Sequence, residues 1–217
     1  MSDHHFSHHD VTKGNDSDVI STSRFSRPMY VTGFQCLVCH AHYEYGNLLT
    51  CPRCGIQGIL DVQYDYDAVR GPLTANIGSR PLDHWRYREL LPISPDVHLP
   101  HLHIGWTPVY VVPRLAHALG VRKLLLKDDS RNPTSSFKDR ASSIGVLKAM
   151  EFGFDTIACA STGNAASSLA GLSAAVGLNS FIFVPERAPE PKVTQLLIFG
   201  AVVLKVKGTY EQAFDLC

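Results

Sequence analysis

The sequence predicts an α/β fold built around a parallel sheet. From about residue 105 onward, short runs of consecutive apolar residues alternate with longer stretches that have helical spacing. Strands that are apolar along their whole length are typical of a parallel sheet covered by helices, with right-handed crossovers between strands. With 217 residues, 45% of them hydrophobic and 18% charged, the chain can bury a sizeable core.

The N-terminal segment, residues 1–28, is polar and has no periodicity, so we expect a disordered tail. It has no apolar stretch of the kind that a secretory signal carries, and no run in the chain approaches the ~20 apolar residues of a membrane-spanning helix. The formal net charge is zero, which gives no indication of nucleic-acid or membrane binding. We therefore expect a cytoplasmic protein. A solvated tail accounts for the four histidines near its start, although they could also bind a metal ion: His4, His5, His8 and His9.

Residues 29–63 carry two Cys-x-x-Cys pairs separated by eleven residues: Cys36, Cys39, Cys51 and Cys54. Four thiolates at this spacing suit a closed tetrahedral site, and Gly55 relieves the tight turn that follows the second pair. We predict a structural zinc ribbon whose folding depends on the metal, with an iron site or redox-active cysteine pairs as alternatives. Four thiolates leave no open position for catalysis. His40 and His42 are expected at the surface.

Residues 64–104 are predicted to be a connector with one short helix, because aromatic and apolar residues have helical spacing from Trp85 to Leu91 before Pro92 ends the pattern. Residues 105–217 then form the α/β domain. Its predicted strands are Tyr110–Val112, Lys123–Lys127, 155–160, 180–184 and 201–206, and the three leucines of Lys123–Lys127 predict that this strand is buried. Its predicted helices are Leu115–Leu119, 137–152, 164–176, 191–199 and one from Tyr210 that Thr209 and Gln212 cap.

Two polar loops of this domain carry the candidate chemistry. In the first, Asn132–Arg140, Pro133 excludes the helical region for Asn132. A helical pattern that begins at Ser136 places Lys138 in the first turn of a helix. An ammonium is poorly placed there, so this lysine either extends into water or serves as an amine of lowered pKa that forms Schiff bases. The second loop, Ser161–Asn164, lies where a strand ends and a helix begins, which favours anion binding, although ordinary capping loops use the same residue types.

The run NPTSSFKDR resembles the corresponding run of threonine synthases, which belong to the fold-type II (tryptophan synthase β-like) enzymes that use pyridoxal phosphate (PLP). WRYRELLP, ASTGNAASS and the cysteine ribbon are also similar, so the resemblance extends from about residue 34 to the end. It implies that Lys138 carries PLP and that Asn164 contacts the cofactor's 3′-oxygen. It also implies a set of residues that hold the substrate carboxylate: Ser161, Thr162, Gly163 and Ala165.

The same resemblance implies conversion of O-phospho-L-homoserine and water to L-threonine and phosphate. Three positions depart from the family: Ile104 replaces an acidic residue, Ala165 a threonine and Ser135 a glycine. If the backbone at 135 has positive φ, serine costs roughly 1–2 kcal/mol there. Lys192 could help to hold a substrate phosphate, although a solvated helix lysine has the same appearance.

Cysteate synthase, threonine dehydratase or another fold-type II enzyme, and a non-catalytic zinc-ribbon binding module, are the alternative functions. A homodimer is a possible assembly. The glycine-rich loop that holds the PLP phosphate in this family is expected beyond residue 217, so we predict that residues 105–217 are an incomplete PLP-binding domain. The chain alone is then expected to bind PLP weakly and to turn over little.

Overall fold

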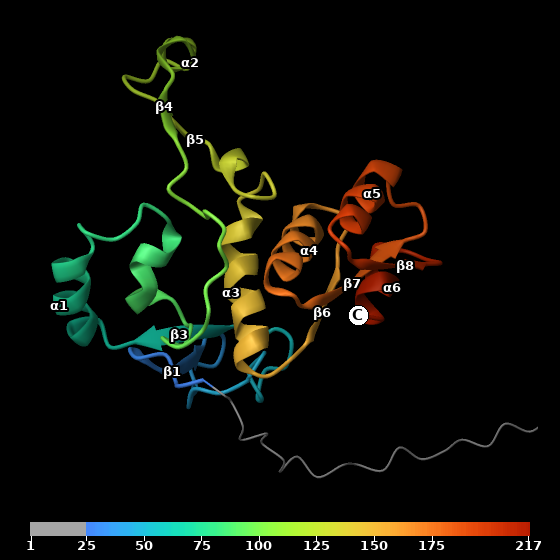
Figure 1. Cartoon of the computed structure of the whole chain (residues 1–217), viewed down its shortest axis with the longest axis horizontal. Coiled ribbons are helices and arrows are strands. Elements are labelled where there is room, and N and C mark those ends of the chain that lie inside the picture. Colours follow the sequence, from blue (N-terminus) through green and yellow to red (C-terminus); the bar gives the residue numbers. More distant parts are fainter. Residues whose placement is uncertain (1–24) are drawn as a thin grey trace, which may run out of the picture.

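Three small sheets organise residues 25–217, which are the residues that the computed structural model describes (Figure 1). Most of the predicted tail, including His4, His5, His8 and His9, lies outside the described residues. None of the helices in residues 25–217 is long and apolar enough to cross a membrane.

The first sheet is the cysteine-bearing ribbon. It consists of β1 (Val31–Cys36), β2 (His42–Tyr43) and β3 (Leu60–Tyr64), in the antiparallel order β2-β1-β3. Gly33 is required in β1, because a Cβ at this position would lie 2.4 Å from the carbonyl oxygen of Tyr43. The short hairpin strands predicted around the cysteines are therefore present.

Two helices follow the ribbon, whereas the sequence predicted only one. The helix that the prediction missed is α1 (Tyr66–Asn76), whose interior contains Gly71 and Pro72, two residues that normally argue against a helix. Asp65 caps it by accepting a hydrogen bond from the amide of Ala68 at 2.9 Å. The predicted helical segment is present as a 3₁₀ helix, η1 (His84–Leu90), which is kinked at Tyr87.

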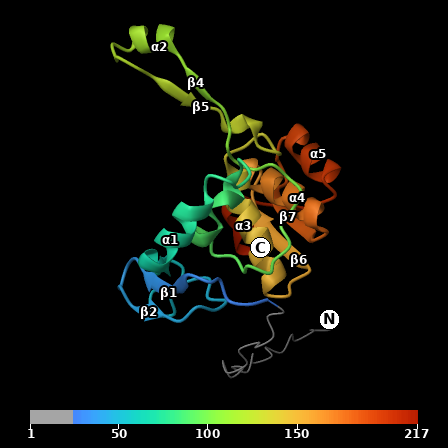
Figure 2. The same ribbon diagram turned by 60° about the vertical axis from the view of Figure 1, so that its left-hand side comes forward.

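An exposed arm projects from the rest of the molecule in both views (Figures 1 and 2). It is formed by β4 (Val109–Val111), α2 (Pro113–Ala118) and β5 (Leu125–Lys127), and its two strands pair with each other in antiparallel orientation. The prediction that Lys123–Lys127 is a buried strand is wrong, because every residue of β5 is exposed and, within residues 25–217, β5 pairs only with β4. An apolar run alone does not distinguish these two environments.

The third sheet is parallel, as the sequence predicted. Its order is β6-β7-β8, formed by β6 (Thr156–Ala160), β7 (Asn179–Pro185) and β8 (Val202–Val206). After the 3₁₀ turn η2 (Asp129–Arg131), helices α3 (Lys138–Glu151), α4 (Asn164–Val176), α5 (Glu190–Ile198) and α6 (Tyr210–Asp215) alternate with these strands. The predicted capping box at the start of α6, between Thr209 and Gln212, is present.

The core lies between α3, α4, α5 and this sheet, where Leu147, Leu172, Ile182 and Leu196 are almost completely buried. Helices α3 and α4 pack side by side. A short turn joins the end of α3 to β6, and β6 leads directly into α4. Both helices therefore begin at the carboxyl edge of the sheet, which is where open α/β sheets bind their ligands.

Candidate functional site

The loop before α3 is held in one conformation by the side chain of Asn132. This residue is buried and extended, with φ −67° and ψ 161°, as Pro133 requires. Its Oδ1 accepts from the Gly105 amide at 2.9 Å, and its Nδ2 donates to the carbonyl oxygens of Asp129 (3.0 Å) and Ser136 (3.1 Å). One amide thus joins three segments of the chain.

A second buried group closes the same loop on the helix. Asp139 is completely buried and accepts a hydrogen bond from the Thr134 amide at 2.7 Å and another from the Thr134 hydroxyl. Thr134 also lies against α4, because a Cβ on Gly171 would be only 2.8 Å from its methyl carbon. Gly171 therefore allows α4 to approach the loop Asn132–Arg140, called the lysine loop below, closely.

Ser135, which replaces the glycine of the family, adopts φ 58° and is therefore in the left-handed conformation. Residues other than glycine rarely adopt this region, and serine is strained there. The hydrogen bonds that Asn132 and Asp139 make within the loop hold its backbone in place, and they maintain the strained conformation of Ser135.

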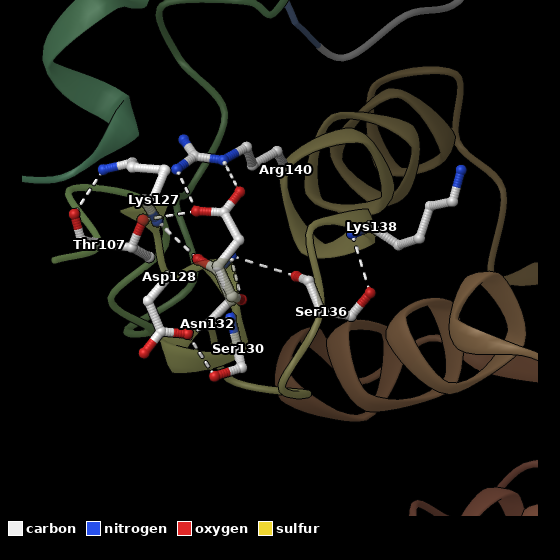
Figure 3. A network of polar contacts seen from close by, with 10 residues as sticks. Thr107, Lys127, Asp128, Ser130, Asn132, Ser136, Lys138 and Arg140 are labelled. Carbon is white, nitrogen blue, oxygen red and sulfur yellow. Dashed lines mark hydrogen bonds and ion pairs between the residues drawn. The ribbon is translucent and has the colours of Figure 1, made fainter. Parts of the chain in front are cut away.

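An ion pair fixes the first turn of α3 from the other side (Figure 3). Arg140 donates from Nε and Nη2 to the two carboxylate oxygens of Asp129, each at 3.0 Å, and the Thr107 hydroxyl donates to the same carboxylate. The hydrogen bonds from Arg140 lower the pKa of Asp129 to about 2, with a further contribution from Thr107. No role was predicted for Arg140 or Asp129; the only available signal was the presence of Arg140 in the NPTSSFKDR run.

Lys138 is the first residue of α3, and its side chain is exposed. Figure 3 shows this side chain extending away from Arg140, on the other side of the helix start. Its backbone amide donates to Ser136 Oγ at 3.0 Å, whereas Nζ has no hydrogen-bond or ion-pair partner among residues 25–217. The predicted lysine is thus an accessible amine on a rigid base.

The second predicted loop is also at the carboxyl edge of the sheet, where β6 ends. Asn164 is the exposed first residue of α4, and no side chain in the described part of the chain, residues 25–217, caps the amides of that helix start. Gly163 is extended, and its amide donates to Ser161 Oγ at 3.1 Å. The structure thus brings Lys138 and Asn164 to the start of two packed helices. The remaining predicted substrate-binding residues lie around Asn164 and are half-buried: Ser161, Thr162, Gly163 and Ala165.

A cavity of about 330 Å³ lies elsewhere, beside η1, and is lined in part by Tyr30, Arg88 and Ile93. None of the predicted site residues lines this cavity. The candidate active site is therefore an open edge of the sheet rather than this cavity.

The four cysteines of the ribbon converge. The Sγ atoms of Cys36, Cys39, Cys51 and Cys54 lie within 4.8 Å of one another. The two pairs form similar turns: His40 (φ 57°) donates its amide to the Cys36 carbonyl, and Gly55 (φ 59°) donates its amide to the Cys51 carbonyl, both at 2.9 Å. The predicted role of Gly55 is confirmed, and neither His40 nor His42 belongs to the cluster.

The thiol of Cys51 has the most distinctive environment of the four. It is fully buried, and the Tyr43 hydroxyl lies 3.1 Å from its sulfur. Burial opposes ionisation, but the hydrogen bonds from Tyr43 and from the amides of Arg53 and Cys54 outweigh this effect and lower the pKa of Cys51 to about 6. Four convergent sulfurs with such donors have the chemistry of a thiolate metal site.

Comparison with known proteins identifies the family of the chain. Residues 101–217 match the family described as pyridoxal-phosphate dependent enzyme, and the chain therefore belongs to that family. Within it, the chain resembles threonine synthases. It is 35% identical to the threonine synthase of Methanocaldococcus jannaschii over 84% of this chain and 45% of that protein. It is 38% identical to that of Methanosarcina acetivorans over 84% of this chain and 44% of that protein.

The chain thus spans less than half the length of these relatives. Among solved structures, apo diaminopropionate ammonia lyase of Escherichia coli is similar, with 25% identity and a TM-score of 0.45 over 51% of this chain and 36% of that one.

The residues at the edge of the sheet fit the cofactor that the family name implies. PLP has an aldehyde that condenses with a free amine, and the Lys138 amine is accessible and has no partner among residues 25–217. The uncapped start of α4 also offers backbone N–H donors to an anionic group.

Proposed function

We propose that the chain is part of a PLP-dependent lyase of the threonine synthase type, which converts O-phospho-L-homoserine and water to L-threonine and phosphate. The observation that carries this proposal is the amine of Lys138, which has no partner among residues 25–217 and lies at the same edge of the sheet as the uncapped start of α4. The similarity to threonine synthases over 84% of the chain supports the choice of reaction.

Lys138 would have two tasks. It would hold the cofactor covalently through its amine, which the exposed side chain leaves free to react. After release by the amine of the substrate, it would accept the protons that leave Cα and Cβ as the phosphate departs from Cγ. It would then return protons to Cγ and, once water has added at Cβ, to Cα. The bound cofactor supplies the electron sink that makes the Cα proton acidic. The rigid loop below Lys138, held by Asn132 and Asp139, keeps the amine in place for both tasks.

The start of α4 would bind and orient the ligands. The Asn164 amide is suited to donate to the cofactor's 3′-oxygen, as the resemblance implies. The hydroxyls of Ser161 and Thr162 and the free amides of the first turn would hold the substrate carboxylate. Alanine at position 165 provides one hydroxyl fewer than the threonine of relatives, so carboxylate binding relies more on the backbone.

A trapping experiment tests the role of Lys138. The chain is incubated with PLP, reduced with borohydride and digested, and the modified lysine is located by mass spectrometry. We expect the modification on Lys138, and its loss in Lys138→Ala. Lys123→Ala, which removes an exposed lysine from the arm, is the matched control and should leave the modification unchanged. Equal labelling of several lysines, or the same yield in Lys138→Ala, would contradict the proposal.

Substrate trials separate the related activities. O-phospho-L-homoserine, O-phospho-L-serine and L-threonine are offered to the PLP-loaded protein, and phosphate and keto-acid release are measured. Phosphate release from the first compound with formation of threonine supports a threonine synthase. Preference for the second or third compound would instead indicate a cysteate synthase or a threonine dehydratase.

We also propose that the four cysteines hold a structural zinc ion. The convergence of four sulfurs within 4.8 Å supports a closed tetrahedral site without an open position for catalysis. Metal analysis should find a single zinc ion per chain, lost in Cys39→Ser and retained in Cys159→Ser, whose cysteine lies in β6. Iron in place of zinc would identify the alternative metal, and metal-free protein with an intact ribbon would contradict the proposal.

A further inference from the structure

One side chain of the cysteine ribbon reaches the far end of the helix that begins with Lys138. Tyr45 lies between the two cysteine pairs in sequence, and its hydroxyl oxygen accepts a hydrogen bond from Lys148 Nζ, in the last turn of α3. The Lys148 nitrogen also lies 4.8 Å from the centre of the Tyr45 ring. Phe34 of β1 packs against the same ring at 5.7 Å, and Arg27 covers it at 5.6 Å.

Glu151 completes this contact from the last residue of α3. It is 3% exposed, forms an ion pair with Lys148 and accepts a hydrogen bond from the Ser94 amide at 2.5 Å. Both charges are largely removed from water, with side chains only 19% (Lys148) and 4% (Glu151) exposed. A buried charge that loses a partner is strongly destabilised, so the Tyr45 hydroxyl matters for more than packing.

The position of Tyr45 depends on the ribbon, and the ribbon has little apolar core of its own. Five of its apolar side chains are exposed to solvent: Leu37 (56%), Val38 (58%), Leu49 (91%), Ile56 (77%) and Ile59 (64%). A unit of this size without a core relies on its metal to fold. Loss of the metal therefore removes the support that keeps the Tyr45 hydroxyl against Lys148.

We propose that Tyr45, Lys148 and Glu151 form a latch through which metal binding at the four cysteines stabilises the C-terminal turn of α3. The latch links the metal site to the helix that presents Lys138, and it rests on the proposed metal site. Because coupling between two sites is reciprocal, the α3 side of the latch must also strengthen metal binding at the cysteines. Tyr45 is a positioning residue in this scheme, since it is not one of the four cysteines and contacts α3 at the end opposite Lys138.

The reciprocal effect gives the first test. Zinc affinity of the whole chain is measured by competition with a chromophoric chelator, and cobalt spectra confirm four-sulfur coordination. We expect Tyr45→Phe and Lys148→Met to weaken metal binding about tenfold, which is within the range of coupled sites. Lys148→Arg, which keeps the donor, should restore most of the affinity. The matched controls Tyr66→Phe and Lys207→Met, at exposed positions, should have no effect.

Hydrogen exchange gives the second test. The amides of Phe152 and Phe154 close the end of α3 by donating to Lys148 and Ala149 carbonyls, at 3.0 and 2.9 Å. Chelation of the metal should speed their exchange in the original protein. Tyr45→Phe keeps the aromatic ring and removes only the hydroxyl. In this variant the two amides should already exchange fast, and chelation should raise their exchange rate little further. Amides in the middle of α4 serve as the internal control.

The outcomes separate the two proposals. Protein that holds no metal on the four cysteines overturns both the metal site and the latch. Metal bound with the same affinity in the original protein, Tyr45→Phe and Lys148→Met overturns the latch alone, as does exchange at Phe152 and Phe154 that does not respond to chelation.

Discussion

Strain at a single residue of the lysine loop has a measurable cost. Ser135 adopts φ 58° although its side chain makes no hydrogen bond that compensates within residues 25–217. Glycine would remove about 1–2 kcal/mol of this strain. It would also destabilise the folded state by about 0.5–1 kcal/mol, because glycine gives the unfolded chain more conformational entropy to lose on folding. We therefore expect Ser135→Gly to raise the free energy of unfolding by about 0.5–1 kcal/mol, measured by urea denaturation.

Ser135→Ala is the control for this prediction. It removes the hydroxyl but keeps the Cβ, so it should not stabilise the protein. Equal stabilisation by alanine and glycine would show that the Cβ is not the source of the strain.

A buried histidine makes the stability depend on pH. His84 contacts Trp85 with ring centres 4.0 Å apart and lies 3.4 Å from Ser143 Oγ, and burial, followed by the charge of Arg140, lowers the pKa of His84 from 6.5 to about 4. Between these values the unfolded chain binds a proton that the folded chain does not. The free energy of unfolding should therefore fall as the pH decreases from about 6.5 to about 4, by at most about 1.4 kcal/mol per pH unit.

Denaturation at a series of pH values checks this expectation. His84→Gln, which cannot titrate, should lower the stability at neutral pH and flatten its decrease in this window. A decrease of the same steepness in both proteins would assign the effect to other groups.

At the scale of elements, the close contact between α4 and the lysine loop predicts a sharp response to one methyl group. A Cβ at Gly171 would lie 2.8 Å from the Thr134 methyl carbon and 3.6 Å from the Phe199 ring. Overpacking of this kind costs about 1–3 kcal/mol, so Gly171→Ala should destabilise the protein by that amount in thermal or urea unfolding.

Two further variants make this prediction specific. Gly145→Ala places the same methyl group on α3 where no atom lies within 4 Å, and should stabilise by up to about 1 kcal/mol through helix propensity. Thr134→Ser removes the opposing methyl and keeps the hydroxyl bonded to Asp139, so it should recover part of the loss in the Gly171→Ala background. If Thr134→Ser recovers none of the lost stability, the destabilisation does not come from the contact between the Thr134 methyl group and position 171.

The sequence predicted the elements whose signals are local. The strands and helices from Thr156 to Asp215 and the paired cysteines all follow from periodicity, spacing and caps. Helix α1 was missed because its signals conflict: Pro72 and Gly71 oppose the helix that the Asp65 cap and tertiary packing support. The exposure of β5 was missed because a run of leucines has the same pattern in a core and on an arm.

The candidate site was predictable as a set of positions but not as a network. Lys138 and Asn164 stood out because each lies in a polar loop at a helix start, and their roles stay predictions that come from the resemblance of NPTSSFKDR and ASTGNAASS to threonine synthases. The pairing of Asp129 with Arg140, and of Thr134 with Asp139, depends on how the loop folds back on the helix, which spacing does not encode. The contact of Tyr45 with Lys148 spans 103 positions in sequence and had no local signal.

At the scale of the whole molecule, the two candidate centres lie at opposite ends of α3. The amine of Lys138 is at its start, and the Lys148–Glu151 pair, with the cysteine ribbon against it, is at its end. The helix is thus held by the polar loop at one end and by the ribbon at the other. One helix therefore joins the cysteine ribbon to the loop that carries Lys138.

The projecting arm has a consequence for handling the protein. Arg114, Arg122 and Lys123 lie on it and are all exposed, and Figure 2 shows it standing clear of the sheet and its helices. Exposed tips are the preferred points of attack for proteases. A short digestion with trypsin should therefore nick the tip first, leaving two fragments that separate only under denaturing electrophoresis, whereas cleavage that begins inside α3 or α4 would show that the arm is covered in solution.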